Sequence, residues 1–217
     1  MALLSREGVV AALLEHQGEL YSEAMGADLG RDTPQELFHW LLGAILLSAR
    51  IDSGVAVASG RALREAGLHK IDAILEAPER RFHDALTQAG YTRYRERTTD
   101  FLKSTALWAR ETCGGDLRRL RDGVEDADAL LEALQGAKGL GPMGAAIFAR
   151  EAQLVWDVLH PRADGPALDA AKDLGLPTDA GALLELAGSR ERFVRLLAAL
   201  TRAAIDGPAD AVREAAR

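Results

Sequence analysis

The stretch that decides the fold of this chain runs Leu130-Leu-Glu-Ala-Leu-Gln-Gly-Ala-Lys-Gly-Leu-Gly-Pro-Met-Gly-Ala-Ala-Ile-Phe148. A helical pattern of leucines leads into Gly136, Gly139 and Gly141, and Pro142 then opens a second apolar run. Proline suits the first turn of a helix, and glycine adopts backbone conformations that other residues resist. The pattern therefore predicts a helix, a tight glycine hairpin and a second helix.

A hairpin of this kind points several backbone N–H groups outward at the start of a helix, which makes an anion site. A nucleic-acid phosphate is one candidate ligand, and its recognition would not depend on base sequence. The alternative is an αα-hairpin whose glycines only make the turn.

The composition predicts a helical globular protein. The chain has 217 residues, of which 48% are hydrophobic and 27% charged, a balance typical of globular proteins. Aromatic residues make up only 5%, whereas alanine and leucine are abundant, which favours helices over strands. We expect an all-α fold.

The net charge of −7 argues against a general nucleic-acid binder, which usually carries a basic surplus. A local basic surface could still bind nucleic acid. Residues 91–110 are a candidate, because the basic residues there outnumber Glu96 and Asp100. These basic residues are Arg93, Arg95, Arg97, Lys103 and Arg110. Such a cluster is usually a solvated helix face. It could also follow phosphates, with Tyr91 or Tyr94 available to stack on a base.

The single cysteine, Cys113, excludes an intramolecular disulfide and a four-cysteine metal site built by this chain alone. The N-terminus lacks the pattern of a signal peptide, and no apolar run is long enough to span a bilayer. We therefore expect a cytoplasmic protein without a membrane partner.

Three further helices are predicted from local signals. Residues 6–25 carry one apolar side. Thr33-Pro-Gln-Glu36 reads as a capping box ahead of a helix that is apolar nearly all round and therefore buried. A long helix over 94–112 presents Phe101, Leu102, Thr105 and Trp108 on one core stripe.

Four segments follow one another in the order Leu46-Leu-Ser-Ala-Arg50, Ala89-Gly-Tyr91 with the long helix after it, Gly139-Leu-Gly141, and His160-Pro-Arg-Ala-Asp-Gly165. In this order they resemble the helix-hairpin-helix, Gly/Pro-rich loop and aspartate (HhH-GPD) superfamily of DNA glycosylases, which includes endonuclease III and the adenine–DNA glycosylases. The resemblance covers residues 33–176.

The resemblance implies a two-lobed helical fold with a central cleft, in which 31–155 form a barrel lobe that contains the hairpin and 1–30 pack with 156–217 as the second lobe. It implies base-excision repair, in which double-stranded DNA is bent and the target nucleotide is flipped out of the stack. The protein would act as a monomer.

The resemblance also implies roles for particular residues. Asp164 matches the catalytic aspartate, which stabilises positive charge at the anomeric carbon or activates a water. DNA contacts fall on Arg50, which would fill the gap left by the flipped base, and on the hairpin residues Lys138, Gly139, Leu140, Gly141, Met143 and Gly144. Pocket candidates are Tyr91, Met143 and His160.

Simpler structural roles stand beside these. Asp164 is placed where a helix N-cap would be, and Lys138 and His160 have the features of surface residues. Asp157 and Asp169, the other aspartates near the loop, are expected at the surface.

Departures from the family pattern narrow the predicted activity. Bifunctional members carry a lysine that forms a Schiff base where this chain has Met143, so we expect a monofunctional glycosylase without lyase activity. The segment after Leu176 has no cysteine, so no iron–sulfur cluster is expected. No metal is needed for the chemistry, although the family often holds a monovalent cation on the hairpin carbonyls.

Two alternatives remain. The chain could be a family member that has lost catalysis and serves as a DNA-binding or interaction module, which the acidic charge and Met143 favour. It could also be a helical protein unrelated to DNA, in which the hairpin is only a turn.

Overall fold

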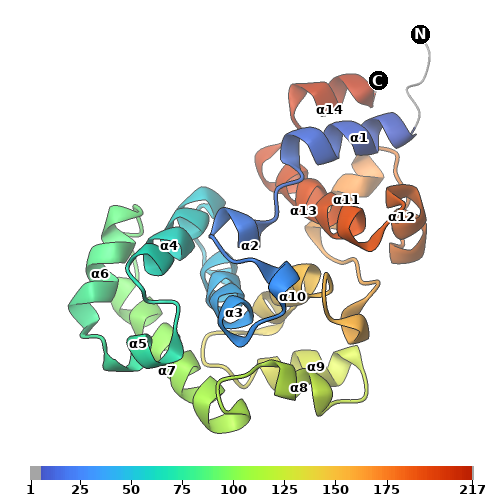
Figure 1. Ribbon diagram of the computed structural model, residues 1–217. Helices are drawn as coiled ribbons and strands as arrows, with labels where there is room; N and C mark the ends of the chain where they lie inside the picture. Colours follow the sequence, from blue (N-terminus) through green and yellow to red (C-terminus); the bar gives the residue numbers. More distant parts are fainter. Residues whose placement is uncertain (1–5, 217) are drawn as a thin grey trace. The chain divides into compact units, whose positions relative to one another are not determined.

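The computed structural model describes residues 6–216 (Figure 1). The regular secondary structure is helical throughout, and the described residues contain no strand. The all-α class predicted from the sequence is confirmed. None of the helices in this range is long and apolar enough to cross a bilayer.

The chain divides into two compact units, each treated by itself below. The middle unit, Ser22–Val158, contains η1 (Leu29–Arg31), α3 (Pro34–Ser48), α4 (Ser53–Glu65), α5 (Ile71–Glu76), α6 (Glu79–Gln88), α7 (Arg95–Cys113), α8 (Arg118–Asp122), α9 (Ala127–Leu134) and α10 (Pro142–Ala152). The terminal unit, Met1–Tyr21 with Leu159–Arg217, contains α1 (Arg6–Gln17), α11 (Pro166–Asp173), α12 (Ala180–Ala187), α13 (Arg190–Asp206) and α14 (Asp210–Ala215). Two short helices, α2 (Tyr21–Ala24) and η2 (Asp157–Leu159), span the divisions in the chain.

The middle unit extends further than the lobe expected over 31–155. Met25 is buried against α3 and α4, which binds the segment before residue 31 to the middle unit. At the other end, Trp156 is fully buried and donates a hydrogen bond from Nε1 to Asp32 Oδ1 at 3.1 Å. These two contacts account for the position of the divisions.

Helix α3 is the buried centre of the middle unit, as its apolar sequence predicts. It packs against α4 and α10, and Trp40 donates a hydrogen bond to a backbone carbonyl of α10 at 2.9 Å. A Cβ atom at Gly144 of α10 would lie 2.7 Å from Leu140 Cδ1 and 3.4 Å from Ser48 Oγ. This close approach fixes the hairpin beside the C-terminal end of α3.

The capping box predicted at the start of α3 is wrong. Thr33 occupies the N-cap position, but its side chain forms no capping hydrogen bond. Glu36 instead accepts two hydrogen bonds from Arg64, at 2.9 and 3.0 Å, and one from the Asp28 N–H. Burial alone would raise the pKa of Glu36, but these hydrogen bonds bring the pKa below its ordinary value.

The single helix expected over 6–25 is also wrong, because α1 ends at Gln17. A Cβ atom at Gly18 would lie 2.3 Å from the Leu14 carbonyl oxygen, so only glycine fits this exit from the helix. The pattern of apolar residues continues past Gly18 because Leu20 is buried as well, although it is not helical.

The long helix is present as α7, and its expected core stripe is confirmed at two of the four positions. Leu102 and Thr105 are fully buried, whereas Phe101 and Trp108 are half-buried. Both rings lie against the hairpin segment rather than in the core. Tyr94, expected as the first helical residue, is instead the N-cap with a left-handed backbone.

The terminal unit is organised around α13, which packs against α1, α11 and α12. Its buried side chains include Phe193, Leu196, Leu197 and Leu200, all part of the predicted apolar stripe.

Candidate functional site

The quoted stretch forms a helix, a glycine turn and a helix, with α9 before the turn and α10 after it. Gly139 has a φ of +92°, a region that favours glycine, and a Cβ atom there would lie 2.6 Å from the Phe101 ring. Gly141 is the N-cap of α10, and Pro142 occupies its first turn. Glycine is therefore required at 139 by conformation and by contact with α7.

Only some of the hairpin residues predicted to contact DNA have a backbone N–H group free to bind a ligand. The N–H groups of Gly139, Gly141 and Met143 form no hydrogen bond within residues 6–216, and all three residues are exposed. Leu140, in contrast, donates its N–H to the Ala137 carbonyl at 3.0 Å, and its side chain is buried. Gly144 is buried beneath Leu140. Outward amides at a helix start can bind an anion, whereas Leu140 and Gly144 serve packing.

Lys138 is paired rather than free. Its Nζ lies 2.7 Å from Asp100 Oδ2, and both side chains are more than half exposed. The Lys138 carbonyl accepts a hydrogen bond from Thr105 Oγ1 at 3.2 Å. Exposed ion pairs of this kind contribute little to stability. Lys138 fits its expected place at the surface.

A cavity of about 470 Å³ lies between the C-terminal end of α3 and the N-terminal end of α7, and we call it the α3–α7 cavity. It brings together Arg50, Tyr91 and Gly139, which the sequence analysis singled out separately. Its lining consists of Ile45, Ser48, Ala49, Arg50, Tyr91, Tyr94, Arg97, Thr98, Phe101 and Gly139.

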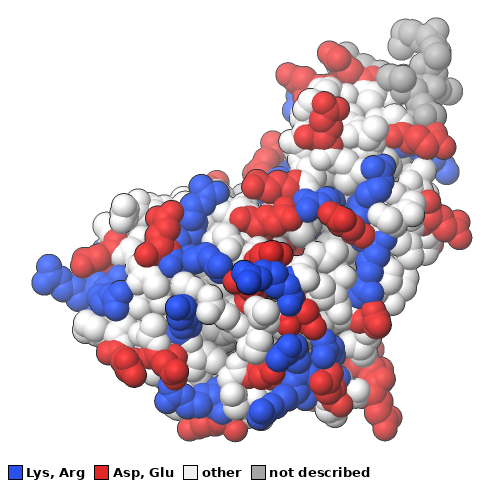
Figure 2. Space-filling view, in the orientation of Figure 1, with Lys and Arg blue, Asp and Glu red and all other residues white. Residues whose placement is uncertain are grey.

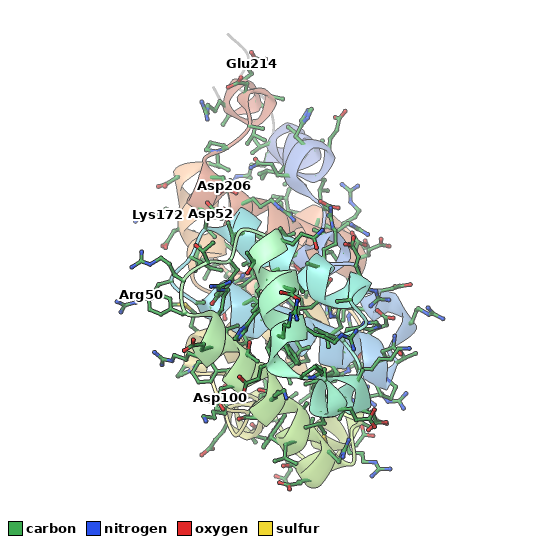
Figure 3. All side chains as sticks on the ribbon, turned by 90° about the vertical axis from the view of Figure 1, so that its left-hand side faces the viewer. Arg50, Asp52, Asp100, Lys172, Asp206 and Glu214 are labelled. Atoms are coloured by element: carbon green, nitrogen blue, oxygen red, sulfur yellow. The ribbon has the colours of Figure 1, made fainter. Side chains whose placement is uncertain are left out.

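The α3–α7 cavity is cationic. Its lining includes Arg50 and Arg97 and no acidic residue. Neither guanidinium forms an ion pair within the described part of the chain, and Arg97 lies with Cζ 5.1 Å from the centroid of the Phe101 ring. Arg50 projects from the periphery of the molecule in Figure 3. Acidic and basic side chains are otherwise interspersed over the face shown in Figure 2, so this local surplus contrasts with the acidic whole.

The two tyrosines near the cavity have different roles. Tyr91 is buried, and its hydroxyl lies 2.7 Å from Thr98 Oγ1, so it forms part of the wall. Tyr94 is 57% exposed and has a φ of 62°, which costs a residue with a side chain roughly 1 kcal/mol or more. The Arg93 guanidinium lies 5.5 Å from the centroid of its ring. Of the two, Tyr94 presents the accessible aromatic face.

Met143 is the most exposed large apolar side chain among the described residues, at 68%. It stands beside the free hairpin amides without filling the α3–α7 cavity.

Asp164 belongs to the terminal unit, in the loop before α11. The N-cap of α11 is Gly165, so the predicted capping role of Asp164 is wrong. The Asp164 carboxylate lies 3.5 Å from Arg162 Nε, and both side chains are about one third exposed. Asp157 and Asp169 are exposed, as expected.

His160 also belongs to the terminal unit and is half-buried rather than at the surface. Its ring lies edge-on to Phe193 of α13, with centroids 5.6 Å apart. This contact anchors the start of the loop that carries Asp164.

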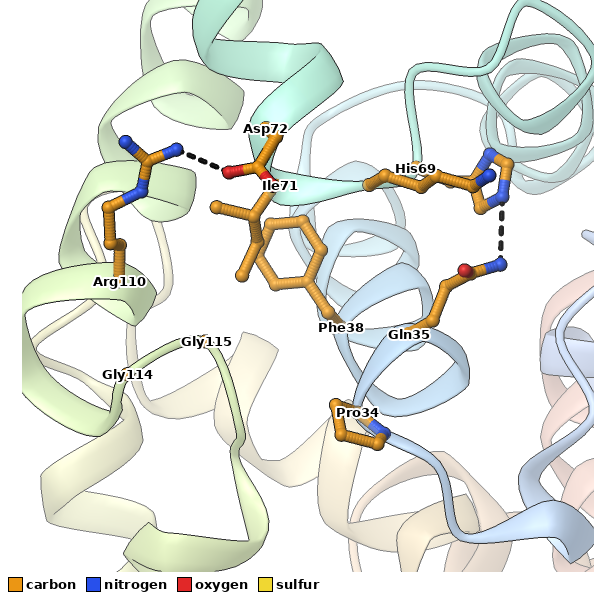
Figure 4. A pocket seen from close by; sticks show the side chains of 10 residues that line it. Pro34, Gln35, Phe38, His69, Ile71, Asp72, Arg110, Gly114 and Gly115 are labelled. Carbon is orange, nitrogen blue, oxygen red and sulfur yellow. Dashed lines mark hydrogen bonds and ion pairs between the residues drawn. The ribbon is translucent and has the colours of Figure 1, made fainter.

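A second cavity of the middle unit, of about 410 Å³, lies beside α5, and we call it the α5 cavity. Figure 4 shows two polar pairs in it, with Phe38 and Ile71 between them. Arg110 Nη2 lies 2.6 Å from Asp72 Oδ1, and Gln35 Nε2 lies 3.1 Å from Nε2 of His69. Burial lowers the pKa of His69, which keeps the ring neutral and able to accept from the Gln35 amide.

No cluster of three or more His, Cys, Asp or Glu side chains within residues 6–216 is arranged to hold a metal ion. Cys113 is buried, and burial raises the pKa of its thiol. A thiol with these properties is a poor nucleophile.

Sequence reasoning missed Phe101 and Thr98 as cavity residues. Phe101 was expected in the core because it falls on the apolar stripe of α7. The available signal was the glycine at 139, since a glycine with no side chain leaves room for a neighbouring ring. Comparisons of the chain with family models, with curated proteins and with solved structures give no match.

Proposed function

We propose that this chain is a monofunctional DNA N-glycosylase with the HhH-GPD fold, which hydrolyses the bond between deoxyribose and a damaged or mismatched base flipped out of duplex DNA. The proposal rests on one observation above the others. Two guanidinium groups without acidic partners line the α3–α7 cavity beside a hairpin whose exposed amides point outward.

This arrangement suits the DNA backbone. Phosphate oxygens accept hydrogen bonds from amides at a helix start and from guanidinium groups, and such contacts carry no base information. Gly139, Gly141 and Met143 would supply the amides, and Arg50 would enter the duplex from the end of α3. The exposed ring of Tyr94 adds a surface on which a base can stack.

Asp164 would supply the catalytic carboxylate. Water adds to C1′ of the deoxyribose while the C1′–N bond breaks, the bonding electrons leave with the base, and the proton lost by water ends on the base. A carboxylate near C1′ lowers the barrier by stabilising the positive charge that develops there or by accepting the proton of the water. The pairing of Asp164 with Arg162 would hold the carboxylate in place.

The expected lack of strand cleavage would follow from Met143. Its thioether cannot form a Schiff base with the sugar, and Lys138, the nearest amine in sequence, is paired with Asp100. The carbonyls of Ala137, Lys138 and Gly141 each accept one hydrogen bond and keep a second lone pair, which is compatible with a monovalent cation at the hairpin. No step of the proposed reaction runs through that cation.

The test is release of free base from duplexes that carry uracil, alkylated, oxidised or mismatched bases. Wild-type protein should release at least one of these bases without nicking the strand, and Asp164→Asn should abolish the release. Asp169→Asn, an exposed aspartate on α11, is the matched control and should retain activity. Release that survives in Asp164→Asn would contradict the assigned catalytic residue.

The second candidate function is a non-catalytic DNA-binding module, favoured by the exposed Met143 where bifunctional relatives carry their nucleophile. It predicts duplex binding without release of any base in the same panel. A helical protein unrelated to DNA would show neither.

A further inference from the structure

The hydrogen-bonding groups of the α3–α7 cavity favour one class of base. The volume of about 470 Å³ falls within the range of small-molecule sites. Ile45 and Phe101 supply apolar walls, and the two guanidinium groups supply N–H donors and no acceptor. A planar ligand that fits this lining carries several acceptors. Bases offer ring nitrogens with one lone pair and carbonyl oxygens with two, so bases rich in carbonyl oxygens match the donors best.

The hydroxyl groups of the cavity supply fewer acceptors than the arginines supply donors. Ser48 Oγ donates its proton to the Ile45 carbonyl at 2.9 Å and keeps two lone pairs, and Thr98 Oγ1 is engaged with the Tyr91 hydroxyl at 2.7 Å. Each guanidinium group carries about five N–H donors and no acceptor, so the lining retains a surplus of donors.

The charge of the lining disfavours a cationic base. Electron-rich aromatic faces attract cations, but the guanidinium of Arg97 already lies 5.1 Å from the centroid of the Phe101 ring. A base with a fixed positive charge would have to displace Arg97 or lie close to it, with no acidic residue in the lining to offset the repulsion. Near a protein surface, repulsion between two unit charges a few ångströms apart corresponds to about tenfold or more in relative affinity.

We propose that the α3–α7 cavity receives the flipped base, and that Arg97 restricts it to neutral bases rich in carbonyl oxygens, such as a 2,4-dioxopyrimidine, whereas Arg50 keeps its proposed place in the duplex. Bases with a fixed positive charge, such as N7-methylguanine, are rejected. This inference rests on the proposed glycosylase activity and names the substrate class of that site.

The test compares two duplexes of the same sequence, one with uracil and one with N7-methylguanine. Because N7-methylguanine is lost more readily without an enzyme, each single-turnover rate is divided by the rate of spontaneous loss from the same duplex. The acceleration for uracil should exceed that for N7-methylguanine by about tenfold or more. Arg97→Gln should reduce this preference by about tenfold, since it removes the charge and keeps an amide donor.

Arg110→Gln is the matched control, because Arg110 lies at the other end of α7 and is already paired with Asp72. It should leave the preference unchanged. A greater acceleration for N7-methylguanine, or an unchanged preference in Arg97→Gln, would overturn the inference while the glycosylase activity stands. Release of neither base, nor of any other base in the wider panel, would overturn the proposed function and this inference with it.

Discussion

The α3–α7 cavity and the α5 cavity lie at opposite ends of helices α3 and α7. They differ in whether their charged and polar side chains have partners within the protein. In the α5 cavity, Arg110 is matched by Asp72, and the Gln35 amide is matched by a neutral His69. In the α3–α7 cavity, Arg50 and Arg97 have no acidic partner among the lining residues. The two volumes are similar, so size alone does not distinguish them. A surface that keeps unpaired charges forgoes some internal stabilisation, and the proposed binding of an anionic or acceptor-rich ligand would account for it.

Replacing the phenylalanine that lines each cavity by alanine should give the largest difference in the free energy of unfolding. Phe38→Ala should lower the free energy of unfolding by about 4 kcal/mol, because Phe38 is buried and its loss leaves a void in the core. Phe101→Ala should cost only about 2 kcal/mol, because Phe101 is half-buried, while DNA binding is lost. Urea denaturation and duplex binding measured on both variants check this. Equal stability losses would remove the distinction between the cavities.

The pH dependence of stability should arise from His39 of α3, which lies next to His69 of the α5 cavity. His39 packs edge-on to His69 at 5.6 Å and donates a hydrogen bond from Nε2 to the Met25 carbonyl. Burial lowers the pKa of His39 from 6.5 to about 4.

The direction of the effect follows from proton binding. Between pH 6.5 and pH 4 the unfolded chain binds a proton at His39 that the native protein does not, so stability falls as the pH falls through this window. The expected loss is about 3 kcal/mol, measured by urea denaturation across the window. His39→Leu should flatten the dependence, and an unchanged slope in that variant would assign the effect elsewhere.

Two glycine substitutions at the hairpin should differ in their effect on stability, because only Gly139 has a backbone conformation that requires glycine. Gly139→Ala should lower stability by about 2 kcal/mol, because the positive φ resists a side chain and the new Cβ would meet Phe101. Gly141→Ala should change stability by less than about 0.5 kcal/mol, because its φ is −84° and no atom lies within 4 Å of the added Cβ. Thermal denaturation of the two variants checks the prediction, which fails if they melt alike.

The smallest expected effect is the change in duplex binding when a single arginine charge is removed. Arg50→Gln should weaken duplex binding by about tenfold and reduce the slope of log affinity against log salt by about 0.9, because it removes one positive charge that would enter the duplex between the phosphates. Arg110→Gln should leave both quantities unchanged, because its charge is already paired with Asp72. Binding titrations at several salt concentrations provide the measurement. A salt slope that Arg50→Gln leaves unchanged would mean that Arg50 does not enter the duplex.

Periodic and local signals were enough to predict most of the helices. The apolar run of α3, the glycine turn after Leu134 and the proline at 142 each act over a few residues, so they can be recognised without the fold. Predictions from local signals were wrong where a residue far away in the sequence formed a stronger interaction with the same side chain. Glu36 had the right spacing for a capping box, but it is buried, and the guanidinium of Arg64 offers it two charge-assisted hydrogen bonds, which are stronger.

The sequence by itself determined the all-α class, the helix–turn–helix connection and the residues available for chemistry, because composition, periodicity and backbone preference are properties of short segments. Only the tertiary structure decided that Arg50, Arg97 and Gly139 share one cavity, that Leu140 and Gly144 are packing residues, and that Tyr94 rather than Tyr91 is exposed. These outcomes depend on which helix faces pack together, and packing between segments far apart in the chain leaves no pattern in either segment alone.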